Sequence, residues 1–80
     1  MSAVLTLDQT PSGKKVKIVN IQAPGRWSQR LLQMGFVPGN TIEVVVNNGF
    51  GPILVRVMGA TISLGRGIAR RIFVEIVNSQ

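Results

Sequence analysis

Apolar and polar residues alternate along several short stretches of this chain, which is the pattern of β-strands with one buried face. The alternation is clearest in residues 41–46, 53–57 and 72–76, where isoleucine or valine occupies every second position. Residues 5–7, 16–21 and 61–64 form further apolar stretches, each bounded by turn signals. The pattern predicts a mainly β fold of roughly five to six short strands that close into a small barrel. Closure is expected to leave no exposed strand edge.

One predicted strand changes phase partway along its length. Val16 and Ile18 alternate in one phase, whereas Val19 and Ile21 alternate in the other. Because a shift of one residue moves side chains to the opposite face of a sheet, we expect a β-bulge or a bend at this point.

Residues 26–34 form the one stretch with helical periodicity. Trp27, Leu31 and Met34 are spaced by four and then three residues, so they share one face of an α-helix. We therefore expect a single helix, inserted between strands and packed across one end of the barrel through these three side chains.

The end of this helix carries clear stop signals. Gly35 stands where a helix commonly ends in a residue with positive φ, and Phe36 is placed to fold back on Leu31. Pro38 and Gly39 occupy the two central positions of a type II turn, because proline sets φ at the first and glycine supplies positive φ at the second.

Two later turns are expected from glycines. Gly59 and Ala60 separate two strands and suit a two-residue type II′ loop, which has glycine in its first position. The glycine-rich segment 65–71 is too short for a long helix, so a single 3₁₀ turn is expected before the last strand.

Composition narrows the classes of function. The chain has 80 residues, 45% of them hydrophobic and 15% charged, and no cysteine, which indicates one packed domain without disulfides. Residues 1–8 lack the features of a signal peptide, and no apolar run is long enough for a membrane helix, so a cytoplasmic protein without direct membrane insertion is expected. The net charge of +6 favours nucleic acid, anionic lipid or an acidic protein surface as partner, although a charged surface also serves solubility alone.

The inventory of reactive side chains argues against catalysis and metal binding. There is no histidine, cysteine or tyrosine, and the only carboxylates are Asp8, Glu43 and Glu75. General acid–base and nucleophilic catalysis need a base that this chain lacks, and three separated carboxylates make a poor metal site. We expect no enzyme activity, no metal site, no cofactor and no small-molecule substrate.

Three motifs resemble a known family. Residues 30–39 read Arg-Leu-Leu-Gln-Met-Gly-Phe-Val-Pro-Gly and resemble the Arg-Leu-x-x-Leu-Gly-Phe-x-Pro-Gly signature of ferrous iron transport protein A, FeoA. Residues 51–59 resemble its Gly-x-Pro-Ile-x-Val-x-Val-x-Gly hairpin, and residues 62–64 with 69–74 resemble its closing Ile-x-Leu and Ala-x-x-Ile-x-Val. The resemblance spans roughly residues 5–77.

The resemblance implies a single SH3-like domain over residues 1–80, with an inserted helix. It implies a small cytoplasmic accessory of bacterial ferrous iron uptake, which contacts the membrane transporter and GTPase FeoB and reaches the inner membrane through that partner. The same module occurs behind DNA-binding domains in metal-dependent repressors. The structural motif residues implied are Leu31, Met34, Gly35, Phe36, Pro38, Gly39 and Gly59.

Some positions depart from the family pattern. Thr10 stands where the family usually has leucine, the loop at 50–52 is one residue tighter than usual, and the turn at 64–69 lacks the usual arginine and acid. These departures concern how the chain contacts its partner rather than its fold.

A partner surface is expected on the outer side of the helix and the adjoining strand face. Leu32 points about 140° away from Trp27 on a helical wheel, beside two arginines. The alternative is that the barrel wraps the helix on two sides and buries Leu32 as well. The predicted contact residues are Leu32, Leu54 and Met58, together with Arg26, Arg30 and Arg56.

A nucleic-acid-binding barrel is the alternative function. Single-strand binders combine a basic groove with aromatic stacking platforms. Phe73 is expected to point outward near Arg70 and Arg71, whereas Trp27 and Phe36 are assigned to packing of the helix. The case rests on charge, so we expect nucleic acid to be the less favoured partner.

Overall fold

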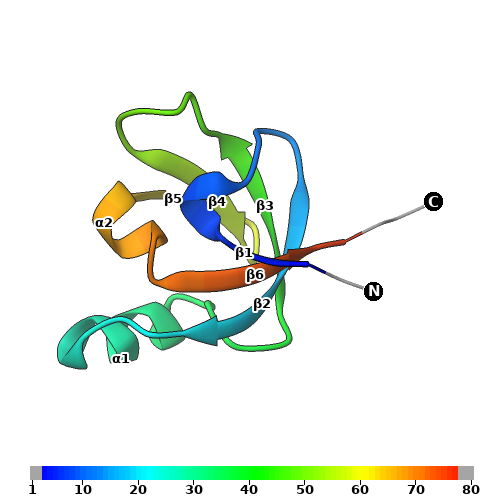
Figure 1. The fold of residues 1–80 in the computed structure, drawn as a ribbon. Coiled ribbons are helices and arrows are strands. Elements are labelled where there is room, and N and C mark those ends of the chain that lie inside the picture. Colours follow the sequence, from blue (N-terminus) through cyan, green and yellow to red (C-terminus); the bar gives the residue numbers. More distant parts are fainter. Residues whose placement is uncertain (1–2, 78–80) are drawn as a thin grey trace.

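The computed structural model describes residues 3–77, so the predicted domain extends at both ends beyond the described residues. Within these residues, six strands and three helices follow one another (Figure 1). They are β1 (Val4–Thr6), η1 (Leu7–Gln9), β2 (Lys15–Ile21), α1 (Gly25–Gln33), β3 (Thr41–Val46), β4 (Ile53–Val57), β5 (Ala60–Leu64), α2 (Arg66–Ala69) and β6 (Ile72–Ile76).

The strands form one antiparallel sheet in the order β1-β6-β2-β3-β4-β5, which curls around the core. In Figure 1, α1 lies at one end of the molecule and the β3–β4 loop at the other. The prediction of a mainly β fold with one longer helix is confirmed. The prediction that closure removes the strand edges is wrong for residues 3–77, because β1 and β5 each pair with a single neighbour.

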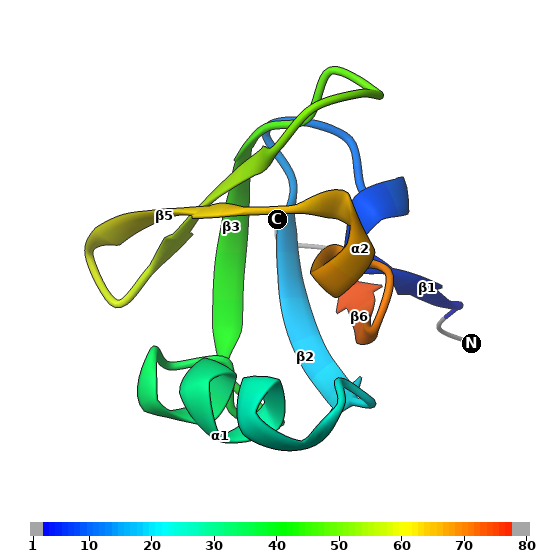
Figure 2. The ribbon, with the colours of Figure 1, turned by 90° about the vertical axis from the view of Figure 1, so that its left-hand side faces the viewer.

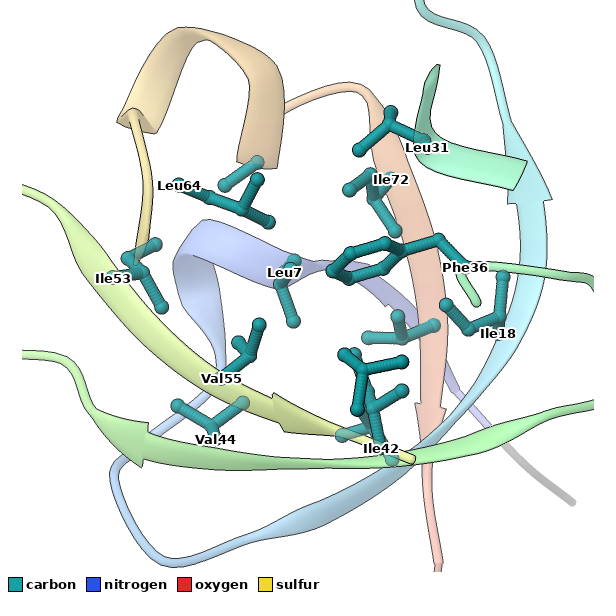
Figure 3. Close-up of a cluster of buried hydrophobic side chains, with 14 residues drawn as sticks. Leu7, Ile18, Leu31, Phe36, Ile42, Val44, Ile53, Val55, Leu64 and Ile72 are labelled. Carbon is teal, nitrogen blue, oxygen red and sulfur yellow. The ribbon is translucent and has the colours of Figure 1, made fainter. Parts of the chain in front are cut away.

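The core consists of the inward-facing residues of the alternating strands, together with side chains from η1, α1 and α2 (Figure 3). It contains Leu7, Val16, Ile18, Leu31, Phe36, Ile42, Val44, Ile53, Val55, Val57, Leu64, Ala69, Ile72 and Val74. Thr10 is fully buried among them, and its hydroxyl donates a 3.4 Å hydrogen bond to the carbonyl of Thr6. A threonine is therefore accommodated at a position where the family that the sequence resembles usually has leucine.

The phase change in β2 is confirmed as an irregularity in its pairing with β6. The register shifts between Ile18 and Asn20, and Val19 is left 39% exposed. On the other side of β2, the N–H of Ile18 donates to the carbonyl of Asn40 at 2.9 Å. The carbonyl of Ile18 accepts from the N–H of Gly39 at 2.8 Å. This contact attaches the turn after α1 to the middle of the sheet.

Helix α1 begins and ends one residue earlier than predicted, with Pro24 at its N-cap. Leu31 is completely buried and Met34 packs partly buried against the core, as expected. Trp27 was expected to pack with them, but it is 36% exposed, and the guanidinium of Arg30 lies 5.2 Å from its ring centroid. The helix contacts the core mainly through its C-terminal part, so its first turn extends past the end of the barrel (Figure 1).

The segment before β6 is an α-helical turn rather than the predicted 3₁₀ turn. Ala69 donates to the carbonyl of Gly65 and Arg70 donates to that of Arg66, both at 3.0 Å, and these bonds span four residues. The fully buried Ala69 anchors the turn in the core. A 3₁₀ helix occurs instead at Leu7–Gln9.

The β4–β5 hairpin turns one residue earlier than predicted. Val57 pairs with Ala60, so the loop residues are Met58 and Gly59. Their φ values are +51° and +83°, which is the signature of a type I′ turn rather than type II′. Ala60 begins the next strand, and Met58 stands at the tip of the hairpin.

Candidate functional site

The C-terminus of α1 is a complete Schellman motif. Phe36 N–H donates to the carbonyl of Leu31 at 2.9 Å, and Gly35 N–H donates to that of Leu32 at 3.1 Å. Gly35 has φ of +100°. The motif directs Phe36 into the core beside Leu31, while the next side chain along the helix, Leu32, is left 44% exposed. The predicted exposure of Leu32 is thereby confirmed, and its burial by the barrel is excluded.

The hairpin tip packs against this helix end. A Cβ atom placed on Gly35 would lie 2.7 Å from Cγ1 of Val57 and 3.1 Å from Sδ of Met58, so both side chains lie directly over the glycine. Met58 is otherwise 83% exposed. The structure thus brings two of the predicted contact regions, the end of α1 and the tip of the hairpin, into direct contact.

Three exposed apolar side chains belong to the segments that meet at Gly35, and we call them the helix-end patch: Leu32, Val37 and Met58. Leu32 precedes the glycine by three residues, Val37 follows it by two and is 38% exposed, and Met58 covers it. Val37 was missed by sequence analysis because it stands in a turn, where neither helical nor strand periodicity reports which way a side chain points.

The other predicted contact residues fall into two places. Arg26 and Arg30 are exposed on α1, where they add positive charge at the same end of the molecule. Leu54 and Arg56 lie on the outward side of β4, with Leu54 half-buried and Arg56 exposed opposite Glu43 of β3. The prediction grouped these residues with Met58, but Met58 stands in the hairpin turn rather than on that strand face.

The carboxylates are dispersed and each lies beside a cation. Glu43 is opposite Lys15 and Arg56 in the sheet, and Glu75 is opposite Lys17. Asp8 lies 3.8 Å from the guanidinium of Arg70. Across residues 3–77, no group of three histidine, cysteine or acidic side chains is close enough to hold a metal ion.

The aromatic side chains do not form one stacking platform. Phe36 is buried, Phe73 is half-buried in β6, and Trp27 lies on α1. Phe50 is 73% exposed in the β3–β4 loop, at the opposite end of the molecule from α1 (Figure 2). In the described part of the chain, no helix combines the length and apolar character needed to cross a bilayer.

Comparison with known proteins agrees with this architecture. The chain is 36% identical over 76 residues to a fusion of Fe(2+) transport protein A with the Fe(2+) transporter FeoB from Porphyromonas gingivalis. That match covers 94% of this chain but only 9% of the fusion protein. The crystal structure of an iron uptake regulatory protein, FeoA, is 35% identical and superposes with a TM-score of 0.86, covering 94% of this chain and all of that one.

A further similar structure is described as an SH3 domain. FeoA of Stenotrophomonas maltophilia, a prokaryotic SH3 domain protein solved in complex with zinc, is 28% identical with a TM-score of 0.79 over 88% of each chain. The predicted SH3-like fold is confirmed, and the prediction that the chain is not an enzyme agrees with a family of non-catalytic accessory domains. Because the FeoA domain model matches residues 5–76, nearly the whole chain, this protein belongs to the FeoA family of ferrous iron transport proteins.

Proposed function

We propose that this protein is a cytoplasmic accessory of ferrous iron uptake that binds a FeoB-type transporter. The observation that carries the proposal is the Porphyromonas gingivalis relative, in which a homologous domain and FeoB are parts of one chain. Fusion holds two domains at high effective concentration, which is useful when they act on each other. The protein reaches the cytoplasmic membrane face through this partner.

The helix-end patch is the contact surface that the geometry supports best. Leu32, Val37 and Met58 offer apolar area on a rigid base, because the Schellman motif and the packing of Met58 on Gly35 hold the backbone in place. Apolar anchors presented on a preorganised surface are typical of binding hot spots. Arg26 and Arg30 are exposed on the same helix, where they add positive charge at this end of the molecule and favour an acidic surface on the partner.

Leu54 and Arg56 form a secondary contact in this proposal. They lie on the outward face of β4, the strand that leads into Met58. A partner that covers the hairpin tip and continues along β4 reaches both side chains. Their replacement is therefore expected to weaken binding less than replacement of Leu32 or Met58.

The test measures binding to FeoB from the same genome, reconstituted in nanodiscs, by biolayer interferometry. Leu32→Gln and Met58→Gln are expected to weaken binding at least tenfold while the thermal midpoint stays within a few degrees. Phe50→Gln is the matched control, because Phe50 is also exposed and apolar but lies at the opposite end of the molecule. Equal binding by all three variants would place the contact elsewhere, and no binding by the wild type would refute the proposed function.

The same assay separates this function from the nucleic-acid alternative. Binding to phosphates falls steeply with salt because counterions are released, whereas a mixed apolar protein contact is less sensitive. We expect the FeoB affinity to change by less than about tenfold between 50 and 200 mM salt. We also expect no retention of single-stranded DNA or RNA at 150 mM salt.

A further inference from the structure

Strand β5 is a terminal strand of the sheet whose free edge can be assigned residue by residue. Val57 and Ala60 flank the two-residue loop, and such a pair exchanges hydrogen bonds. Hydrogen-bonded and non-hydrogen-bonded pairs then alternate along the hairpin, so Ile62 and Leu64 also bond to β4. The N–H and C=O groups of Thr61 and Ser63 point the other way, out of the sheet.

This edge lacks the features that usually protect a terminal strand. β5 reads Ala-Thr-Ile-Ser-Leu, with no charged residue and no proline, in a chain with nine lysines and arginines. Thr61 and Ser63 are both exposed, and between residues 3 and 77 no segment other than β4 bonds to the backbone of β5. Figure 2 shows β5 crossing the view from the hairpin tip towards α2. The outward backbone groups of Thr61 and Ser63 are therefore available to pair with another strand.

We propose that a second copy of this chain occupies this edge, with the two β5 strands antiparallel about a two-fold axis at Ile62. Thr61 of each copy then exchanges two backbone hydrogen bonds with Ser63 of the other, which uses all four outward groups of each strand. The two Ile62 residues face each other as the close, non-hydrogen-bonded pair. The hydroxyls of Thr61 and Ser63 meet across the strands, as in other stabilising cross-strand pairs.

Self-pairing is compatible with the positive charge of the chain. The nearest cation on the strands at the edge is Arg56, which lies on β4 opposite Thr61. The two β4 strands of the pair are separated by three strand spacings, about 14 Å. This distance exceeds the Debye length of about 8 Å at physiological salt, so repulsion between the two arginines is largely screened. An uncharged strand therefore favours a second identical strand over a charged partner segment.

The pairing is short, so the association is expected to be weak and to depend on concentration. The test is sedimentation equilibrium from about 10 to 1,000 μM, combined with amide NMR spectra over the same range. We expect the average mass to rise towards that of a dimer. Concentration-dependent shifts are expected to centre on the amides of Thr61 and Ser63. Shifts centred on the helix-end patch instead, or a monomer at 1,000 μM, would overturn the proposal.

Two variants test the geometry without disturbing the monomer. Ser63→Pro removes an outward N–H that β4 does not use, as edge strands tolerate, and Thr61→Lys places a charge on the edge. Both are expected to stay monomeric with a thermal midpoint close to the wild type. Asn48→Lys adds the same charge on an exposed loop residue and is expected to dimerise normally. If Ser63→Pro unfolds, Thr61→Lys still decides, and normal dimerisation by Thr61→Lys would refute the edge contact. These results do not depend on FeoB binding.

Discussion

The side chain of Met58 lies on the backbone of Gly35. Its Sδ would be 3.1 Å from a Cβ atom at that position, and Cγ1 of the buried Val57 would be only 2.7 Å away. The contact joins the tip of the β4–β5 hairpin to the end of α1, two segments more than 20 residues apart in the sequence. Glycine is required there twice, for its φ of +100° and for the space that the hairpin occupies.

Gly35→Ala is expected to lower the free energy of unfolding by about 2–4 kcal/mol, through backbone strain and overpacking together. Gly39→Ala is the matched control, because Gly39 has a φ of +96° but a Cβ atom added to it would meet no other atom within 4 Å. It should show the strain alone, about 1–2 kcal/mol. Urea denaturation of both variants measures the difference. Equal losses would show that the hairpin does not press on the helix end.

Leu31→Ala is expected to cost about 2–5 kcal/mol, because Leu31 is completely buried and its removal leaves a cavity in the core. The neighbouring Leu32→Ala serves as control, since its side chain is 44% exposed, and it should cost less than about 1 kcal/mol. The measurement is the urea midpoint at constant slope. An unchanged midpoint for Leu31→Ala would show that α1 does not belong to the cooperative core.

Asn47 is expected to be the most sensitive polar position of the loops opposite α1. Its side-chain Nδ2 donates to the carbonyls of Asp8 at 3.0 Å and Thr10 at 2.7 Å, and its Oδ1 accepts from Gly49 N–H at 3.1 Å. Asn47→Asp puts an oxygen against two carbonyl oxygens and should cost about 1–3 kcal/mol. The exposed Asn48→Asp should change stability by less than about 0.5 kcal/mol. Thermal unfolding compares the two, and similar midpoints would contradict the proposed role of Asn47.

The isolated protein is expected to show no specific site for Fe²⁺ and no GTP hydrolysis. The reason is the dispersed carboxylates and the missing imidazole and thiolate ligands and bases. Anaerobic calorimetry with Fe²⁺ measures iron binding, and titration of a known chelator serves as the positive control. A saturable one-to-one site with Kd below roughly 10 μM, about −7 kcal/mol, would contradict this prediction.

Local sequence was sufficient to predict most strands, the longer helix and which of its two adjacent leucines is exposed. The period-two pattern of 53–57 and 72–76 defined strands, and the stop signals at Gly35 and Phe36 defined the helix end, because these features depend on neighbours within a few residues. The helical wheel likewise separated Leu31, which is buried, from Leu32, which is exposed. Whether Leu32 contacts FeoB remains a proposal that binding measurements test.

The tertiary structure decided what depends on distant segments. Trp27 shares the stripe of Leu31, yet it is partly exposed because the first turn of the helix extends past the barrel end. The pairing of Val57 with Ala60 moved the hairpin turn to Met58 and so placed that side chain on Gly35. The linear strand order left the edge of β5 free. A sequence pattern reports which face of an element is apolar, but only packing between elements determines how much of that face is covered and which edge stays open.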